Sequence, residues 1–424
     1  MGTDAKLHIG IVGGGVAGIG AAYLLQRKYR VTLLEKNDYL GGHTHTILLP
    51  EGPDAGTPVD TGFIVMNEKN YPDLCWFLAQ LDVKTQPGDM SLSVEVPSRK
   101  VLYSSDLPGG LFARLGNLWS LSFYRMIREV FRFYRQARED LEAGRVPAGS
   151  TLGEYLKQGG FSKTFAEDHL IPMAAAIWSV PPGKVPDFPV LTFLRFYQNH
   201  GLLSLTQKPL WRTIAGGSHS YVRVFEKNFQ GEILLNTPAL AVKRHDNSAE
   251  VRTARGSLSF DRVVIAGHAD EALALLQDPS AEESRLLGAW RYSANQTVLH
   301  RDAKMMPPVK RAWASWNVFR DDAAGAPSSV AVTYYMNRLQ RLRTASDYFV
   351  TLNREAAIEL SKVVGSFLYH HPIYDFASLG SQEALSALNG RRNTYYCGGY
   401  FGHGFHEDAI RSGFEVAGLL GVPR

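Results

Sequence analysis

Three glycines near the start of the chain, Gly13, Gly15 and Gly18, have the G-x-G-x-x-G spacing of a dinucleotide-binding turn. They lie between an apolar run at residues 7–12, which predicts a buried strand, and a helical pattern at residues 19–27. In such a turn the first glycine permits a sharp bend, the second lets the backbone approach a pyrophosphate, and the third lets the helix pack closely on the strand. The free N–H groups and the positive dipole end of the helix attract the phosphates. The pattern predicts a phosphate cradle in preference to an ordinary glycine-rich turn.

A carboxylate follows at the distance that a ribose requires. Residues 31–34 predict a second strand that ends at Glu35, where a carboxylate can accept both ribose hydroxyls and would repel the 2′-phosphate of NADP. The sequence Gly41-Gly42-His43 comes six residues later. A second glycine pair after the acid resembles the FAD-binding proteins of the glutathione-reductase-like superfamily, and the resemblance implies FAD. No other G-x-G-x-x-G marks a separate nicotinamide site. The cofactor-binding residues predicted in this region are Gly13, Gly15, Val16, Ala17, Gly18, Glu35, Lys36, Gly41, Gly42 and His43.

The C-terminal region resembles the closing FAD segment of the flavin-containing amine oxidase superfamily. Residues 395–400 read YYCGGY and predict a short strand with a small-residue end, and a helix is expected from residue 407. In the superfamily this strand end contacts the ribityl, and the helix start stabilises negative charge on the reduced ring. Residues 60–64 (DTGFI) resemble the stretch that passes the isoalloxazine ring, and the backbone near Val242 resembles the adenine contact. The cofactor residues that these resemblances imply are Thr61, Gly62, Phe63, Ile64, Val242, Gly399, Tyr400, His406, Glu407, Asp408 and Ala409.

These segments predict the fold class and the division of the chain. We expect an α/β protein with a Rossmann-like FAD-binding domain, of glutathione-reductase-like or amine-oxidase type, and an inserted α+β substrate domain. Two domains are the natural expectation for 424 residues. The FAD-binding domain is expected to be discontinuous, at residues 1–70, 212–292 and 388–424. The substrate domain is expected at residues 71–211 and 293–387, with an exposed turn at residues 321–329.

The chain departs from amine oxidases of the superfamily at three positions. Those enzymes carry a Lys near flavin N5, where this chain has Asn295 or Gln296, and some carry a Tyr before the closing helix, where this chain has Phe405. Both differences weaken the case for amine oxidation. The cysteine that attaches the flavin in some relatives is missing, because Cys397 lies at the strand end instead. We therefore expect non-covalent FAD.

A closer resemblance is to a bacterial subgroup described as predicted NAD/FAD-binding proteins. It is carried by runs such as residues 200–203 (HGLL), 211–218 (WRTIAGGS) and 404–408 (GFHED). Its members resemble enzymes that act on unsaturated or methylated fatty acyl chains, including a desaturase in furan fatty acid formation. The resemblance implies an FAD-dependent oxidoreductase that desaturates such a chain or carries out a related hydride transfer at flavin N5. Three alternatives stay open: an amine or amino-acid oxidase with an altered pocket, a redox-neutral fatty acid isomerase that uses the flavin, and a non-enzymatic FAD-binding protein.

Hydride transfer at N5 often needs a base beside the substrate. Tyr334 and Tyr335 are adjacent on an expected strand, so only one of them can face the pocket. For each candidate a structural hydrogen bond is the more ordinary role, since only geometry decides. Residues 172–180 (PMAAAIWSV) are apolar and either line a lipid tunnel or pack in the core. The candidate catalytic residues are His200, Tyr334, Tyr335 and His403, and His406 is a further candidate.

The charge and composition of the chain limit the partners that we expect. The formal net charge of +4 is too small to predict nucleic-acid binding, and the two cysteines make neither a disulfide framework nor a metal site. The start of the chain lacks the apolar core of a signal peptide, and no run of 18 apolar residues predicts a transmembrane helix. We expect a cytoplasmic protein, with a fatty acyl or phospholipid substrate, that can associate peripherally with the inner membrane face. The oligomeric state is not predicted.

A helix expected at residues 123–138 suggests that peripheral contact. At about 100° per residue four of its arginines, at positions 125, 128, 132 and 135, fall within about 80° of one another. Phe123, Ile127, Val130 and Tyr134 cluster on the far side. A basic face opposite an aromatic apolar face is typical of an interfacial helix, and anionic headgroups attract each arginine by roughly 1 kcal/mol. A helix that simply covers a core has the same pattern.

Overall fold

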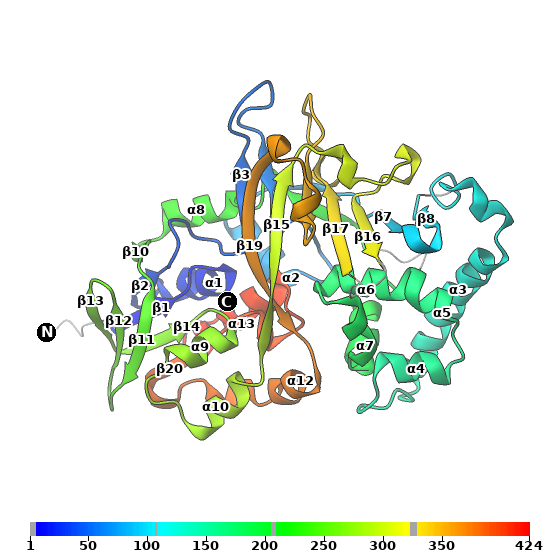
Figure 1. The fold of residues 1–424 in the computed structure, drawn as a ribbon. Helices are drawn as coiled ribbons and strands as arrows, with labels where there is room; N and C mark the ends of the chain where they lie inside the picture. The colour runs from blue at the N-terminus through cyan, green and yellow to red at the C-terminus, as the bar shows by residue number, and fades with distance from the viewer. Residues whose placement is uncertain (1–5, 107, 205–208, 323–328) are drawn as a thin grey trace, which may run out of the picture.

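The protein is described by a computed structural model of residues 6–106, 108–204, 209–322 and 329–424. Most of the turn expected at residues 321–329, namely 323–328, lies outside the described residues. A parallel sheet and its helices lie at one end of the molecule, and a group of helices lies at the other (Figure 1). Two long strands, β15 and β19, lie side by side in the middle of the molecule, with one of these ends on each side of them.

The first layer is a five-stranded parallel sheet of short, buried strands, as expected when helices cover both faces of a sheet. Its order confirms the predicted Rossmann-like α/β class. All five strands come from the three segments predicted for the FAD-binding domain, although the domain boundaries themselves stay a prediction. The strands, in spatial order, are β10 (Glu232–Leu234), β2 (Arg30–Leu34), β1 (His8–Val12), β14 (Arg262–Ile265) and β20 (Thr394–Tyr396).

Two helices, α1 (Val16–Leu25) and α13 (His406–Leu419), pack tightly against each other on this sheet. Nine of the ten residues of α1 are buried, which explains why this helix is apolar all round. A Cβ on Gly413 would lie 2.2 Å from the carbonyl oxygen of Ala17, so glycine permits the close approach. Helix α2 (Pro72–Gln80) belongs to the predicted substrate segment, yet its apolar face joins the core around α1 and α13.

The second layer is a seven-stranded mixed sheet. Adjacent strands of this sheet are antiparallel, except that β16 and β7 are parallel. The longest ladder joins β15 to β19 and places Asn295 opposite Tyr369 and Ser293 opposite His371. The strands, in spatial order, are β19 (Val363–Ile373), β15 (Arg291–His300), β18 (Phe349–Leu352), β17 (Ser329–Tyr335), β16 (Trp316–Asp321), β7 (Leu92–Val96) and β8 (Val101–Ser104).

A helical group packs on this second sheet. Helix α6 (Ile171–Trp178) lies against β16, β17 and β19, while α3 (Leu121–Glu142) packs on α5 (Lys163–Phe165) and α7 (Val190–Asn199). Helix α4 (Leu152–Gln158) also contacts α7. Most of the apolar stretch 172–180 is buried in α6, which supports core packing over a tunnel lining.

Smaller elements complete the first end of the molecule. Helix α8 (Ser220–Asn228) packs on α1, while α9 (Ala269–Leu275), α10 (Ala281–Leu287) and α12 (Phe376–Gln382) follow one another in contact. An antiparallel sheet of β11 (Ala239–Arg244), β12 (Ala249–Thr253) and β13 (Gly256–Phe260) lies at the left edge of Figure 1. The short strands β3 (Thr46–Leu48) and β4 (Pro58–Asp60) pair with each other, and β9 (Trp211–Ile214) pairs with β5 (Met66–Asn67) and β6 (Thr85–Pro87).

Helix α3 corrects one expectation about the membrane. Phe123 is buried, and Ile127, Val130 and Tyr134 pack against the same core. This apolar face is therefore covered by the protein and is not available to a bilayer. Among the described residues, no helix is both long and apolar enough to cross a membrane.

Candidate active site

The turn between β1 and α1 leaves the start of α1 open. Gly13 has φ +108°, and a Cβ there would lie 2.3 Å from the carbonyl oxygen of Ala266, so only glycine fits. A Cβ on Gly15, the N-cap residue, would meet none of the described atoms within 4 Å. Within the described chain no side chain caps α1, and its first turn contains no acidic residue. The first N–H groups of α1 are therefore left for a ligand, and a pyrophosphate fits there.

Glu35 lies beside this turn and is buried. Its Oε2 accepts a hydrogen bond from the N–H of Gly14 at 2.8 Å, and its Oε1 accepts one from the N–H of Asn37 at 2.9 Å. A carboxylate offers about four lone-pair positions, so acceptors remain for two ribose hydroxyls. The residues present thus fit the adenosine and pyrophosphate half of FAD.

Two residues predicted to bind the cofactor, Lys36 and Val242, make contacts within the protein. The ammonium of Lys36 forms an exposed ion pair with Glu271 at 2.8 Å, so this side chain lies at the surface. The carbonyl oxygen of Val242 accepts a hydrogen bond from the N–H of Gln277 at 3.1 Å. We correct the expectation for the Lys36 side chain, because its charge is already paired, and the adenine contact near Val242 stays a prediction.

A short segment joins the glycine turn to the N-terminus of α13. The N–H of Gly41 donates to the carbonyl oxygen of Gly14 at 2.8 Å, and three residues further on the Oγ1 of Thr44 hydrogen-bonds to Nε2 of His406 at 2.9 Å. His406 stacks on Phe63 with ring centroids 3.8 Å apart. An extended molecule can therefore follow this segment from α1 to α13, as the predicted FAD site requires.

His406 is a positioning residue in this arrangement and not a base. Its Nε2 contacts the hydroxyls of both Thr44 and Tyr221 at 2.9 Å, and burial lowers its pKa to about 3. A ring held by two hydroxyls and one aromatic stack keeps the start of α13 beside residues 61–63.

Three imidazoles gather beyond the carboxyl ends of β1 and β14. The ring centroid of His43 lies 5.5 Å from that of His371 and 6.3 Å from that of His268. Burial lowers the pKa of His43, and the two neighbouring imidazoles lower it further. Burial likewise lowers the pKa of His371 to about 4. His43 Nε2 is buried without a hydrogen-bond partner among the described residues, which marks a place for a polar group of the cofactor. The described residues contain no group of three or more His, Cys, Asp and Glu side chains that could hold a metal.

Asn295 and Gln296, the two candidates for the lysine position of amine oxidases, point to opposite sides of β15. Asn295 is buried, and its Nδ2 lies 3.3 Å from Nδ1 of His371. Gln296 points to the other side of β15, where its amide donates to Ser366 Oγ at 2.7 Å. Asn295 is thus the residue directed toward the imidazoles. Its contact with His371 follows from the β15–β19 register, which no local sequence signal reveals; the neighbouring pair at 370–371 (HH) was the only hint.

A second aromatic group forms where α7 ends beside the start of α13. His200 stacks on Phe196 at 3.9 Å, and Phe196 stacks on Phe405 at 4.9 Å between ring centroids. His403 approaches the edge of Phe196 at 6.0 Å. Two predicted catalytic residues, His200 and His403, are therefore brought together although they are far apart in sequence. Phe196 was missed, although it lies one helical turn before His200.

The electrostatics of this group favour uncharged imidazoles. Burial lowers the pKa of His200 to about 4, while its bond to the Phe196 carbonyl opposes the shift. Burial also lowers the pKa of His403, although Asp408 opposes that shift. Nδ1 of His200 must donate to the Phe196 carbonyl oxygen, 3.0 Å away, because a carbonyl can only accept. This bond fixes the tautomer and puts the lone pair on Nε2.

The acidic side chains at the start of α13 bind backbone N–H groups of the protein. The Glu407 carboxylate accepts the N–H groups of Asp73 and Leu74 at 2.9 and 3.0 Å, and so caps α2. Burial raises the pKa of Glu407 to about 7. Asp408 Oδ2 accepts the N–H groups of His403 and Phe405 at 2.9 and 3.1 Å. Both carboxylates are thus bonded to N–H groups at helix starts. The predicted contact of Glu407 and Asp408 with the cofactor would therefore be made by their backbone.

The tyrosine pair on β17 is also separated. Tyr334 is turned toward the core between the sheet and α6 and contacts Trp316 edge-on at 4.7 Å. Tyr335 points to the other face, where its hydroxyl donates to Asp347 at 2.6 Å. Tyr335 therefore faces away from Tyr334, as adjacent residues of a strand do, and its catalytic role stays a prediction. Tyr334 stays a candidate without a contact to His200 among the described residues.

The contacts of three further predicted cofactor residues are defined. Thr61 Oγ1 and the Tyr369 hydroxyl on β19 are 2.7 Å apart. A Cβ on Gly62 would lie 2.2 Å from the carbonyl oxygen of His43. The Tyr400 hydroxyl is buried without a partner among the described residues. Val16, Ala17, Ile64, Gly399 and Ala409 lie at the ends of the same elements, and their roles stay predictions.

We expect the flavin to be released intact on denaturation. The two cysteines are poor candidates for a covalent link: Cys397 is fully buried, and burial raises the pKa of Cys75 to about 11, so that few molecules carry a thiolate. The protein should purify yellow, and heat or acid should transfer all flavin colour to the supernatant, where chromatography identifies FAD. Colour that remains with the precipitate would contradict this expectation.

Comparisons with known proteins agree with this geometry. The family model described as flavin containing amine oxidoreductase matches residues 16–303. The FAD-dependent oxidoreductase pigF of Monascus ruber is 43% identical over 74 residues, which cover 17% of this chain and only 15% of that relative. Two solved structures share the fold along nearly the whole chain. The CLA-producing fatty acid isomerase from P. acnes has a TM-score of 0.68 at 15% identity and 99% coverage of both chains. Cyclohexylamine oxidase from Brevibacterium oxydans has a TM-score of 0.66 at 15% identity and 98% coverage of both chains.

Proposed function

Because the chain belongs to the flavin-containing amine oxidoreductase family, we propose that this FAD-dependent oxidoreductase oxidises an unsaturated or methylated fatty acyl chain. The observation that carries the proposal is the stack of His200, Phe196 and Phe405 at the start of α13. Aromatic faces and an uncharged imidazole suit an apolar substrate better than an ionic one. The fatty acid isomerase and the cyclohexylamine oxidase share this fold equally well, so the proposed substrate class rests on the aromatic stack.

His200 is the group that would take a proton in this reaction. Desaturation removes a hydride from one carbon and a proton from the next, and a carbon–carbon double bond remains. FAD, when bound, supplies the two-electron hydride acceptor. The His200 ring has its Nδ1–H directed to the Phe196 carbonyl oxygen, so Nε2 carries the lone pair that accepts the proton. With a pKa of about 4, this imidazole is in its accepting form near neutral pH.

The same surroundings disfavour a cationic amine. An ammonium group buried here would need a free carboxylate. The charge of Asp408 raises the pKa of both His200 and His403. Its carboxylate, however, already accepts two backbone N–H groups and forms an ion pair with Arg411 at 2.8 Å. Asn295 or Gln296 stands where the resemblance places the lysine of amine oxidases, and Phe405 offers no hydroxyl.

We expect acyl lipids, and not amines, to reduce the flavin. The FAD-loaded protein is mixed without oxygen with bacterial phospholipids and, separately, with primary amines and polyamines; flavin bleaching is followed and acyl composition is then measured. Bleaching by lipid with a new double bond supports the proposal. Bleaching by an amine with turnover on the order of 1 per second or faster would contradict it. A rearranged acyl chain without net bleaching would replace oxidation by redox-neutral isomerisation.

A further inference from the structure

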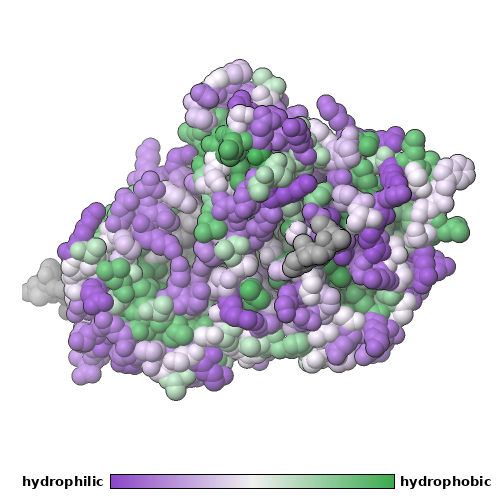
Figure 2. Space-filling view, viewed as in Figure 1, coloured by the Kyte–Doolittle hydropathy of each residue, from purple (hydrophilic) through white to green (hydrophobic). Residues whose placement is uncertain are grey.

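We propose that the outer face of α3 and the turn before it bind the surface of an anionic phospholipid bilayer. The described structure exposes large apolar side chains here on consecutive turns, and Trp119 and Leu121 are 88% and 87% exposed. A single exposed apolar residue is ordinary, whereas a continuous patch marks an interaction site. Hydrophobic residues are visible at this end of the molecule, at the right edge of Figure 2. We call the set the apolar ridge; it consists of Leu115, Leu118, Trp119, Leu121, Tyr124 and Phe131.

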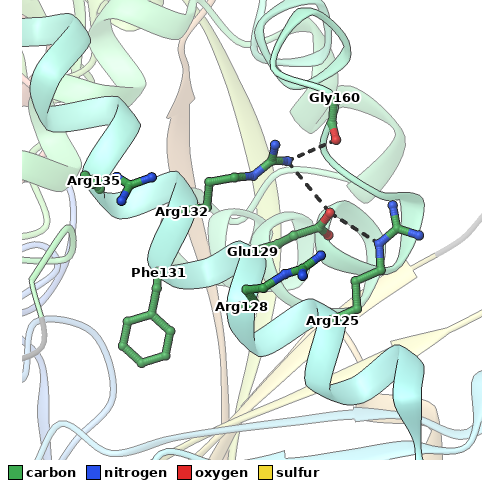
Figure 3. A pocket seen from close by; sticks show the side chains of 7 residues that line it. All are labelled: Arg125, Arg128, Glu129, Phe131, Arg132, Arg135 and Gly160. Carbon is green, nitrogen blue, oxygen red and sulfur yellow. Dashed lines mark hydrogen bonds and ion pairs between the residues drawn. The ribbon is translucent and has the colours of Figure 1, made fainter.

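Arginines share the outward face of α3 with this ridge. Figure 3 shows Arg125, Arg128, Arg132 and Arg135 around a surface hollow of about 570 Å³, with Phe131 pointing away from them. The side chains of Arg125 and Arg135 are 58% and 70% exposed. The one acidic group that lines the hollow, Glu129, is buried at its base and lies 3.5 Å from Arg125. Glu129 also pairs with Arg132 at 3.7 Å, and Arg135 pairs with Glu139 at 3.9 Å. Two carboxylates cannot neutralise four guanidinium groups, so the hollow keeps a positive charge and attracts anions.

A second basic hollow adjoins the other end of the ridge. It has a volume of about 460 Å³, and its charged lining consists of Arg99, Lys100, Arg114 and the buried Asp168. Asp168 pairs with Arg99 at 2.6 Å, so Lys100 and Arg114 leave the hollow basic. The ridge is thus accompanied by positive charge at both ends. Apolar side chains that project beside arginines match the boundary between acyl chains and anionic headgroups. The four arginines extend along three turns of one helix, and this elongated, single-sign pattern fits a charged surface better than a compact partner with a defined pocket.

The position of α3 connects this surface to the candidate active site. Helix α3 packs on α7, and α7 ends at the residue before His200. In this one respect the inference rests on the proposed function: a bilayer-bound enzyme would take its acyl chain from the membrane beside α3. Vesicle binding itself requires no turnover, so the two proposals are tested separately.

The test is sedimentation of the FAD-loaded full chain with vesicles of phosphatidylcholine, with and without phosphatidylglycerol. We expect binding to the anionic vesicles that weakens as salt rises. Replacing Arg125, Arg128 and Arg135 by glutamine should weaken binding roughly tenfold or more. Arg132 is left in place because it donates a hydrogen bond to the carbonyl oxygen of Gly160 at 3.0 Å. In a second variant, Trp119→Ser with Leu121→Ser, salt-resistant binding should be lost.

Matched controls lie at the opposite end of the molecule. Lys243→Gln, Arg252→Gln and Arg255→Gln remove the same charge from the three-stranded sheet, where these residues are exposed. Leu240→Ser with Leu360→Ser removes two exposed leucines elsewhere. Both control variants should bind vesicles like the parent protein. Wild-type protein that stays in the supernatant with anionic vesicles at low salt overturns the proposal. So does equal loss of binding in the charge variant and its control, or a dimer abolished by the Trp119 and Leu121 changes without any vesicle binding.

Discussion

Gly15→Val is expected to give a folded protein that holds no FAD. Gly15 has φ −71° and ψ 177°, a conformation open to any residue, and a Cβ there meets none of the described atoms within 4 Å. The free protein should therefore tolerate valine with a small change in Tm, since the helix loses only a glycine N-cap. The valine methyl groups would occupy the space through which a pyrophosphate approaches the first N–H groups of α1. Losing several charge-assisted hydrogen bonds, at about 1.5–3 kcal/mol each, should lower FAD affinity on the order of 100-fold or more.

The measurement is the flavin content of the purified protein, together with titration of the apoprotein with FAD. Gly149→Val serves as the control, because a Cβ at Gly149 also meets none of the described atoms within 4 Å but lies in an exposed loop before α4. This control should purify yellow. If Gly15→Val retains one FAD per chain, the cofactor does not approach α1 at this glycine, and the phosphate cradle predicted from the motif is wrong.

The glycine turn could be predicted from sequence because its signals are local. The bend at Gly13 and the carboxylate of Glu35 are separated by one strand–helix–strand unit, so spacing alone fixes which groups meet. The parallel sheet followed from the same reasoning, since short apolar runs that alternate with helices indicate a doubly wound fold. The family match and the shared fold confirm that class.

The imidazole groups could not be predicted in the same way, because they depend on long-range pairing. His43, His268 and His371 come from three different loops and strands, and the β15–β19 register decides that Asn295 joins them. Nothing in the spacing of these residues encodes that register. The contact between His200 and Phe405, whose ring centroids are 5.6 Å apart, likewise requires α7 to end against the start of α13.

Sequence patterns also leave open which atoms of a predicted residue meet the cofactor. Glu407 and Asp408 stand where a motif places cofactor contacts, yet their carboxylates accept backbone N–H groups of α2 and of the loop before α13. The physical cause is general: every helix start has unpaired N–H groups, and a nearby acid stabilises them. A helical wheel of α3 correctly separated its two faces, but it could not show that the aromatic face is the one that the core covers.

His200→Gln is expected to lower kcat for acyl-chain oxidation by roughly 100- to 10,000-fold, the range for removal of a general base. The glutamine amide takes the place of the Nε2 end of the ring, where it cannot accept a proton. FAD content should be unchanged, because the described contacts of His200 are with Phe196 and Phe405 and not with the glycine turn. His169→Gln is the matched control, since burial also lowers the pKa of His169 to about 4 but its ring contacts Tyr103 and Phe165 in the helical core. A larger loss in His403→Gln than in His200→Gln would move the base to His403.

The pH dependence gives a second, independent readout of the same group. Burial lowers the pKa of His200 from 6.5 to about 4, so the proton-accepting form predominates at every pH above about 4 and is lost as the pH falls through that value. Anaerobic flavin reduction by substrate in a single turnover should therefore show no inflection from this group between pH 5 and 8. An ordinary exposed histidine would give a tenfold fall per pH unit below about 6.5. An inflection near 6.5 that disappears in His200→Gln would show that the ring is hydrated in the working enzyme, and the buried, uncharged base inferred from the Phe196 stack would then be wrong.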